Sequence, residues 1–270
     1  MKKISLFLFI LLATLSVSAQ DSYQAKLDKL IKIEMDGMDL QQIAEKTFSN
    51  GLAGKGELSD EAQRKAKEFT SEIMPKAIDI LKRHYRANLT EQQLDEIIVF
   101  MQDPESSVAR KRLINLFSDG KAMSKIKDLM QPALLAAFNG KKASVSTEDI
   151  PADYRSKFNE FVKSYDFVSK MTSVIDQVFK SFVPHDATPE QLEQMKSMQN
   201  TLTQFFNDNG NDIAMVLCHE MLTANDLDRV NKLYATPTGQ AYQRALNGAT
   251  DEFINLVIER IKGYRIYTAE

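Results

Sequence analysis

The chain has very few of the residues that cross-link or interrupt a fold. Its 270 residues include one cysteine, Cys218, so no disulfide can form within the chain. Glycine occurs 10 times, proline 7 times, and tryptophan is absent. Because an all-β protein needs many turns, this shortage of turn-forming residues argues against one. We therefore predict an all-α fold that is stabilised by packing alone.

Neither sign of charge dominates the sequence. There are 34 basic and 37 acidic residues, and without residues 1–19 the basic count falls to 32, a net charge of −5. A nucleic-acid partner would require a basic face, so we predict no binding to nucleic acid. The hydrophobic share of 43% and the charged share of 26% are typical of a packed domain.

The only long apolar run lies at the N-terminus. Lys2 and Lys3 precede the apolar residues 4–15, and Val17-Ser18-Ala19 form a small-residue cleavage site. This pattern predicts a secretory signal peptide at 1–19. We expect a mature chain that is exported to the periplasm and has no membrane span after cleavage. A retained N-terminal anchor is the alternative.

The most informative pattern is a motif that occurs twice. Residues 89–113 read LTEQQLDEIIVFMQDPESSVARKRL, and residues 222–246 read LTANDLDRVNKLYATPTGQAYQRAL. Both copies open with Leu-Thr (Leu89 and Leu222), place Leu-Asp five residues later, and break at a proline ten residues after that. The shared breaks predict an internal repeat.

Each copy begins with the signature of a helix N-terminus. Thr90 and Thr223 occupy N-cap positions, and Gln93 and Asp226 follow three residues later, so each copy can form a capping box. Apolar side chains then recur at helical spacing. They are Leu94, Ile97, Ile98 and Met101 in the first copy, and Leu227, Val230 and Tyr234 in the second.

Each motif helix should end at a sharp corner. Asp103-Pro104 and Thr236-Pro237 are both typical of an N-cap followed by proline at the first helical position. Because the residue before a proline avoids helical dihedrals, the short helix must stop there and a longer one must start. Gly239 lies in the new first turn, where two helices could approach closely.

The repeat predicts the domain organisation. We expect a first helical repeat at 20–138, a linker at 139–150 (NGKKASVSTEDI), and a second helical repeat at 151–267. Each unit would be a helical bundle with a short motif helix, a proline corner and a long helix. The two units could be packed together or swapped.

Turn-forming residues predict further helix boundaries. Asp119-Gly120 should divide the helix after the first corner. Thr188 should start a capped helix with Gln191, which the run NDNG at 207–210 should interrupt. Between the break at Asp119-Gly120 and the cap at Thr188, one helix should span residues 154–182.

The repeated motif resembles a known family. Leu-Thr-x-x-x-Leu followed by an apolar pair and Pro-x-(Gly/Ser) is similar to the exported bacterial domain of unknown function "twenty fifty-nine". The second copy, with Thr236-Pro237-Thr238-Gly239, is the closer match, whereas the first has Ser106 at the glycine position. The resemblance implies an exported helical protein with no assigned activity and no catalytic residues.

The residues that usually carry chemistry form no recognisable catalytic or metal pattern. His84, His185 and His219 lack metal-ligand spacing, and we predict no cofactor and no metal site. Cys218, beside His219, is either a reactive nucleophile or a small core residue, and its apolar neighbours favour the core. Every carboxylate that can be placed is expected on a polar helix face or in a first turn, and no two lie in an apolar setting that would raise a pKa for acid–base chemistry.

Two basic clusters and the methionines remain. Residues 82–86 (KRHYR) and 110–112 (RKR) could form one anion-binding patch, or could stabilise helix ends through the dipole. Methionines such as Met198 and Met215 could form an adaptable binding surface or fill a helical core. We predict a non-enzymatic envelope module that binds a protein, peptide or lipid. The alternative is an envelope hydrolase with a dispersed active site.

Overall fold

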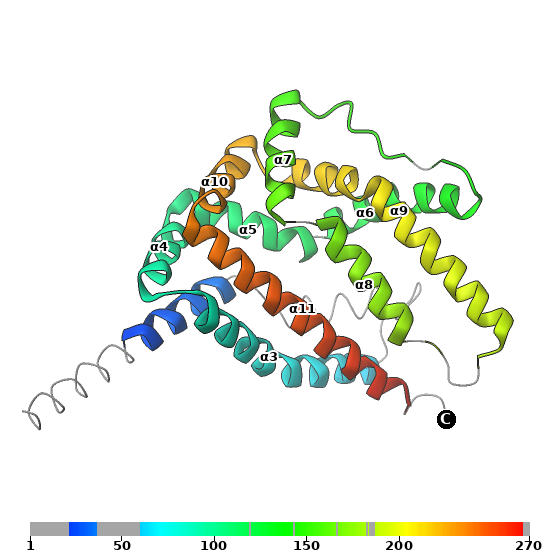
Figure 1. Ribbon diagram of the computed structural model, residues 1–270, viewed down its shortest axis with the longest axis horizontal. Coiled ribbons are helices and arrows are strands. Elements are labelled where there is room, and N and C mark those ends of the chain that lie inside the picture. Colours follow the sequence, from blue (N-terminus) through cyan, green and yellow to red (C-terminus); the bar gives the residue numbers. More distant parts are fainter. Residues whose placement is uncertain are drawn as a thin grey trace, which may run out of the picture.

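A computed structural model describes residues 22–36, 60–118, 120–142, 144–165, 167–181, 183 and 187–266 (Figure 1). Helices account for most of these residues, and none of the described residues lies in a strand, so the all-α prediction is confirmed. The predicted signal peptide at 1–19 lies outside the described residues.

The helices follow in this order. After a first helix at residues 22–35 come α3 (Asp60–Asn88), α4 (Glu91–Gln102), α5 (Pro104–Ser118), α6 (Gly120–Phe138), α7 (Ala152–Tyr165), α8 (Phe167–Ser181), α9 (Pro189–Met221), α10 (Ala224–Tyr234) and α11 (Pro237–Ile266). Helices α3 and α11 lie side by side and antiparallel over much of their length, although they come from opposite ends of the chain (Figure 1).

The predicted capping boxes are all present. The side chain of Thr90 accepts a hydrogen bond from the backbone of Gln93, whose side chain accepts one from the Thr90 N–H at 2.9 Å. The same exchange joins Thr223 to Asp226, with the second bond at 2.7 Å, and Thr188 to Gln191. Because each box satisfies two otherwise unpaired N–H groups, these short sequences determine where their helices begin.

Both proline corners are also present. Asp103 lies between α4 and α5, and its Oδ2 accepts hydrogen bonds from both the N–H and the hydroxyl of Ser106 at 2.9 Å. Thr236 lies between α10 and α11, and its hydroxyl accepts a bond from the Gly239 N–H at 3.0 Å. Pro104 and Pro237 are the first residues of their helices, as predicted.

Two predicted boundaries are wrong. Residues 207–210 do not interrupt α9, which runs unbroken through them. The buried Asn209 side chain donates to the Phe205 carbonyl at 3.1 Å, one turn back, so the helix itself satisfies its donor. Gly210 leaves room for Val168, whose Cγ2 would lie 3.1 Å from a Cβ at that position. Tertiary packing therefore overrides the weak helix propensity of this run.

The predicted helix at 154–182 is in fact two helices. Helix α7 ends at Tyr165 and α8 begins at Phe167, while α7 itself starts at Ala152. The Gln243 side chain of α11 donates to the Ser164 carbonyl, which a continuous helix would use internally. A contact 79 residues away thus supports the end of α7, and nothing local to residue 166 marked that position.

The main hydrophobic core joins the two ends of the chain. It combines buried side chains of the first helix, α3, α4 and α11, namely Leu27, Leu30, Ile31, Tyr85, Leu89, Leu94, Ile97, Ile98, Met101, Ala241, Tyr242 and Ala245. The predicted linker also packs inward, because Val145 and Ile150 are buried in two further cores. The region between α6 and α7 is therefore irregular in backbone but attached to the rest of the fold.

Contacts between the two motif copies are reciprocal. Glu96 of α4 accepts a hydrogen bond from Thr238 of α11. In the other direction, Arg229 of α10 forms an ion pair with Glu105 of α5. Arg229 occupies the position equivalent to Glu96, and Glu105 the position equivalent to Thr238, because each lies 133 positions from its counterpart. The first motif helix thus contacts the second long helix, and the second motif helix contacts the first long one. The tandem repeat stays a prediction, because paired contacts alone do not show that the two halves share a fold.

Gly239 is required by the close approach of α11 to the end of α10. A Cβ on Gly239 would lie 1.9 Å from the carbonyl oxygen of Leu233 and 2.9 Å from the Cα of Tyr234. Both are backbone atoms, which cannot rotate away as a side chain can. We expect Gly239→Ala to lower the free energy of unfolding by about 3 kcal/mol, at the upper end of overpacking costs.

Gly210→Ala is the matched control in urea denaturation. Its new methyl would come closer than ordinary van der Waals contact to Cγ2 of Val168 alone, at 3.1 Å, with Phe206 at 3.8 Å or more. Alanine also gains about 1 kcal/mol of helix propensity over glycine. The control should therefore stay within about 1 kcal/mol of the wild type. Equal losses in both variants would show that the corner at Gly239 is not tight.

Candidate functional site

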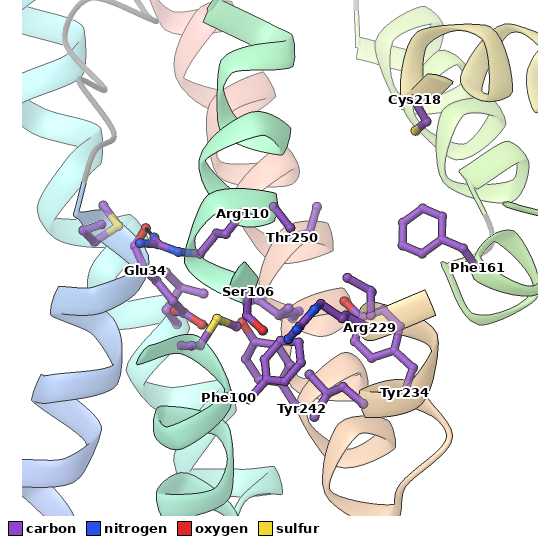
Figure 2. A pocket seen from close by; sticks show the side chains of 18 of the residues that line it. Glu34, Phe100, Ser106, Arg110, Phe161, Cys218, Arg229, Tyr234, Tyr242 and Thr250 are labelled. Carbon is purple, nitrogen blue, oxygen red and sulfur yellow. Dashed lines mark hydrogen bonds between the residues drawn. The ribbon is translucent and has the colours of Figure 1, made fainter. Parts of the chain in front are cut away.

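A cavity of about 580 Å³ lies between the first helix, α3, α4 and α5 on one side and α7, α9, α10 and α11 on the other. Most of its lining consists of Met, Phe, Leu, Val and Ala side chains contributed by these eight helices. Its size falls within the range of small-molecule sites, roughly 300–1,000 Å³. The cavity is therefore the candidate functional site (Figure 2).

Polar groups line the cavity mainly on one side. Figure 2 shows Glu34 and Arg110 together, whereas Phe161 and Cys218 lie apart from them across the view. The cavity is thus amphipathic, with a charged end and an apolar end.

Glu34 is a buried carboxyl group. It follows Leu27, Leu30 and Ile31 on the same face of the first helix and is only 8% exposed. Its oxygens accept hydrogen bonds from the hydroxyl of Tyr85, at 2.7 Å to each, and from that of Tyr242. The expectation that every carboxylate lies in a polar setting is wrong at this residue.

Burial raises the pKa of Glu34 to about 7. Hydrogen bonds from Tyr242 and Tyr85 and the positive charge of Arg110 oppose the shift, but the loss of hydration outweighs them. The pKa values of Tyr85 and Tyr242 are raised well above 10, first by burial and then by the Glu34 charge, so both remain hydrogen-bond donors. This cluster joins the first helix, α3 and α11 at the cavity wall.

Arg110 supplies a positive charge from α5. Its Nη1 donates to the backbone carbonyls of Glu34 at 3.1 Å and Asp36 at 3.3 Å. Both acceptors are neutral, and no carboxylate of the described residues forms an ion pair with Arg110. A guanidinium group has five N–H donors, so Arg110 can still bind an anion.

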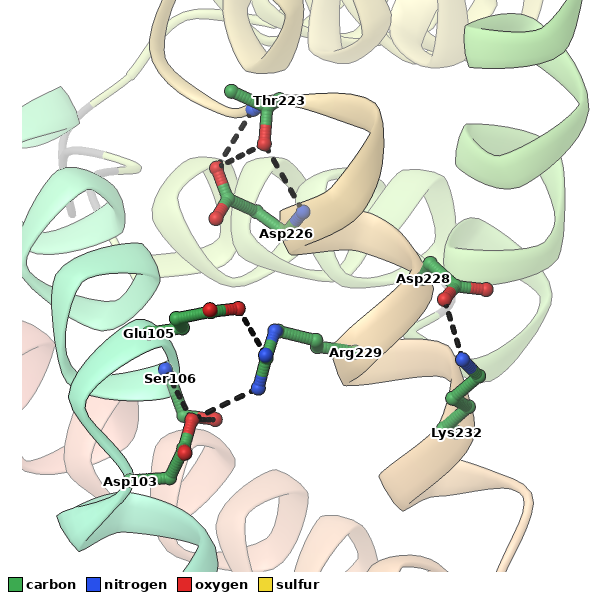
Figure 3. Close-up of polar contacts among 8 residues, drawn as sticks. All are labelled: Asp103, Glu105, Ser106, Thr223, Asp226, Asp228, Arg229 and Lys232. Carbon is green, nitrogen blue, oxygen red and sulfur yellow. Dashed lines mark hydrogen bonds and ion pairs between the residues drawn. The ribbon is translucent and has the colours of Figure 1, made fainter.

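Arg229 and its partners hold α10 against α5 (Figure 3). Its Nη1 lies 2.9 Å from Asp103, its Nη2 pairs with Glu105, and both acceptors belong to the first proline corner. In the opposite direction, Arg112 of α5 lies 2.6 Å from Asp226, which is part of the second capping box. We call this set the α5–α10 ion pairs.

The two basic clusters do not form the single anion-binding patch that was one of their two interpretations. Lys82 pairs with Asp28 of the first helix, and Arg83 pairs with Glu252 of α11. In the second cluster, Arg110 lines the cavity and Arg112 pairs with Asp226. The cations are therefore distributed among separate partners and do not form one surface.

Cys218 lines the apolar end of the cavity as a buried residue, with 7% of its surface exposed. Burial raises the pKa of its thiol to about 12, so the nucleophilic thiolate does not form at neutral pH. The interpretation of Cys218 as a small core residue is confirmed. The neighbouring His219 ring packs edge-on against Tyr154, with centroids 4.7 Å apart.

The predicted motif residues surround the cavity without lining it. Among them, the leucines are buried, the threonines and Asp103 cap helices, and the prolines start them. The residues concerned are Leu89, Thr90, Leu94, Asp103, Pro104, Leu222, Thr223, Leu227, Thr236, Pro237 and Gly239. Their neighbours Phe100, Met101, Ser106 and Arg229 do line it. The motif residues thus fix the helices whose neighbouring side chains line the cavity.

Of the two residues that give the cavity its charged end, sequence reasoning missed Glu34 and named Arg110 only as part of the basic cluster at 110–112. Glu34 continues the 27-30-31 apolar spacing of its helix, and an acid on an apolar stripe was a usable signal. Arg110 carried no such signal, because its role depends on the first helix, 74 to 76 residues earlier in the chain.

The described residues were also searched for metal and membrane features. His, Cys, Asp and Glu side chains nowhere gather there in a group of three or more suited to a metal ion. Within the same ranges, every helix is too short or too polar to serve as a membrane span.

No protein-family model, curated protein or solved structure matches this chain. The resemblance to the "twenty fifty-nine" domain therefore stays a prediction.

The buried Glu34 makes stability depend on pH in an unusual direction. Its pKa is about 7 in the folded protein and about 4.5 when unfolded, so the folded state holds more protons between these values. Stability from this group is present below pH 4.5 and is lost as pH rises to 7, by about 3 kcal/mol in total. Glu34→Gln removes this loss.

We expect the stability of Glu34→Gln relative to wild type to increase from pH 4.5 to 7 and then level off, as measured by urea denaturation at each pH. Glu91→Gln is the control. Glu91 is an acid whose pKa is lowered, first by its hydrogen bond to Lys26, so this variant should show no such increase. If the free energy of unfolding of Glu34→Gln relative to wild type stays constant from pH 4.5 to 7, the pKa of Glu34 is not raised by burial.

Proposed function

We propose that this protein is an exported, non-enzymatic binding module of the bacterial cell envelope, and that it holds a lipid-like ligand in the cavity. One observation carries the proposal, namely a cavity of about 580 Å³ with an overwhelmingly apolar lining and a charged end. An apolar lining of this kind is unfavourable to leave in contact with water, and an apolar ligand would cover it. The predicted signal peptide at 1–19 supports the periplasmic location.

A lipid fits the cavity better than a peptide does. Each peptide unit brings a donor and an acceptor that need partners when buried. The polar groups of the lining are mostly engaged already, because Glu34 is bound by two tyrosines, Arg229 by two carboxylates, and Ser106 by Asp103. An alkyl chain makes no such demand. The cavity lining also includes methionines such as Met35 and Met74, whose flexible side chains can adjust to the shape of a ligand.

The alternative is an envelope hydrolase that uses Glu34. A carboxyl group with a pKa near 7 in contact with two tyrosines is suited to general acid–base chemistry. The tyrosines stay protonated, however, and the thiol of Cys218 lies apart from Glu34 across the cavity (Figure 2). A lone acid without a neighbouring nucleophile favours binding over hydrolysis.

Native mass spectrometry of protein purified from the periplasm tests the proposal directly. We expect a bound species that dissociates on gas-phase activation and that solvent extraction identifies as a lipid. Protein that carries no such species, and that also fails to bind a neutral apolar dye such as N-phenylnaphthylamine, would contradict the proposal.

A variant that fills the cavity provides the second test. Ala77 of α3 lines the cavity, so Ala77→Phe should place a ring in the ligand space and reduce dye binding at least about tenfold, the equivalent of 1.4 kcal/mol. Ala87→Phe is the control, because Ala87 is exposed on the same helix. If both variants bind the dye like wild type, the cavity is not the binding site.

Glu34→Gln separates binding from hydrolysis. As a binding module, the variant should retain its dye affinity, and neither protein should hydrolyse ester or cell-wall substrates. Hydrolysis by the wild type that is lost in Glu34→Gln would support the enzyme instead.

A further inference from the structure

The charges that line the cavity are unequally neutralised. Arg229 is paired with Asp103 and Glu105, so the three groups together carry no positive excess. Glu34 has its oxygens occupied by the hydroxyls of Tyr85 and Tyr242. Burial raises the pKa of Glu34 to about 7, so this carboxyl group is only partly ionised at neutral pH, whereas Arg110 keeps its full positive charge.

Of the two arginines that line the cavity, Arg229 has two ion-pair partners and Arg110 has none among the described residues. The Nη1 of Arg110 contacts two neutral carbonyls, and among the described residues no carboxylate comes within ion-pair distance. A guanidinium keeps its charge at any physiological pH and binds carboxylate and phosphate groups through two parallel N–H bonds. The complementary ligand group is therefore an anion.

A cationic ligand group fits this end less well. Its only partner would be Glu34, which already accepts hydrogen bonds from two hydroxyls and is held close to Arg110 by the contact between Arg110 and the Glu34 carbonyl. A bound ammonium group would face the guanidinium at short range, and like charges in a desolvated site repel strongly. An anionic head group has the opposite, favourable interaction.

The size of the cavity limits the rest of the ligand. A volume of about 580 Å³ corresponds to roughly twenty groups the size of a water molecule, each about 30 Å³ in a liquid. One alkyl chain of sixteen to eighteen carbons with its head group has about this many heavy atoms, whereas a two-chain phospholipid has more than twice as many. The apolar end, marked by Phe161 and Cys218, lies across the cavity from Arg110 (Figure 2).

From these observations we infer that the ligand is a single-chain amphiphile with an anionic head, such as a long-chain fatty acid. The head pairs with Arg110 and the chain extends toward Phe161 and Cys218. The inference rests on the proposed lipid-binding function and specifies the class of ligand.

Three ligands with the same sixteen-carbon chain test the head group. Palmitate, hexadecanol and hexadecyltrimethylammonium, each below the concentration at which it aggregates, are titrated against bound N-phenylnaphthylamine. We expect palmitate to displace the dye at least about tenfold more effectively than the other two, because only its head group can form a charge-assisted hydrogen-bond pair with Arg110. Hexadecyl phosphate, as a second anion, separates a requirement for charge from one for a carboxylate.

The test of Arg110 uses a neutral substitution and its neighbour. Arg110→Gln should remove the advantage of palmitate while the dye itself still binds. Lys111→Gln removes the same charge from the next residue of α5, where the side chain is exposed, and should preserve that advantage. Circular dichroism and dye affinity show whether Arg110→Gln keeps its fold, and Arg110→Lys, which keeps a positive charge, should recover part of the preference.

The outcomes separate a failure of the anionic head group at Arg110 from a failure of the proposed lipid-binding function. If all three ligands displace the dye equally in wild type, the cavity binds apolar molecules but Arg110 does not select an anion. If the ammonium compound binds best, Glu34 is the head-group site and the inference is wrong. If neither dye nor ligand binds, and Ala77→Phe has no effect, the binding function itself fails.

Discussion

The buried Glu34 and its two tyrosine partners form the interaction on which the rest of the structure depends. Tyr85 of α3 and Tyr242 of α11 both donate hydrogen bonds to the Glu34 carboxyl group on the first helix. A buried carboxyl without such donors would cost several kcal/mol. The cluster therefore ties together segments that are 51 and 208 residues apart.

The same cluster explains why the cavity has a charged end. Holding Glu34 in the wall also brings its backbone carbonyl within reach of Arg110, which lines the cavity beside it. On the other side, the α5–α10 ion pairs join the first proline corner to Arg229 and join α5 to the second capping box, so they keep α10 in place. Partly exposed ion pairs of this kind contribute little stability individually, but they specify which surfaces meet. The polar contacts thus define the shape of the cavity, and the apolar side chains fill its walls.

Features that depend on neighbours within a few residues were predictable from the sequence. The capping boxes at Thr90, Thr188 and Thr223 were placed correctly because donor and acceptor lie three residues apart. Residues 207–210 were misjudged, because Gly210 is accommodated by Val168 of another helix. The break after Tyr165 was missed for the same reason, since the supporting side chain, Gln243, lies far along the chain.

The sequence by itself determined the all-α class, the start of each capped helix and the two proline corners, because caps, proline geometry and apolar spacing act locally. Only the tertiary structure decided that the first helix and α11 share a core, that Glu34 is buried beside Arg110, and that a cavity lies between the eight helices. A cavity is a property of surfaces that meet after long-range packing. Its position depends on which side chains face one another across helices, and no spacing along the chain encodes that.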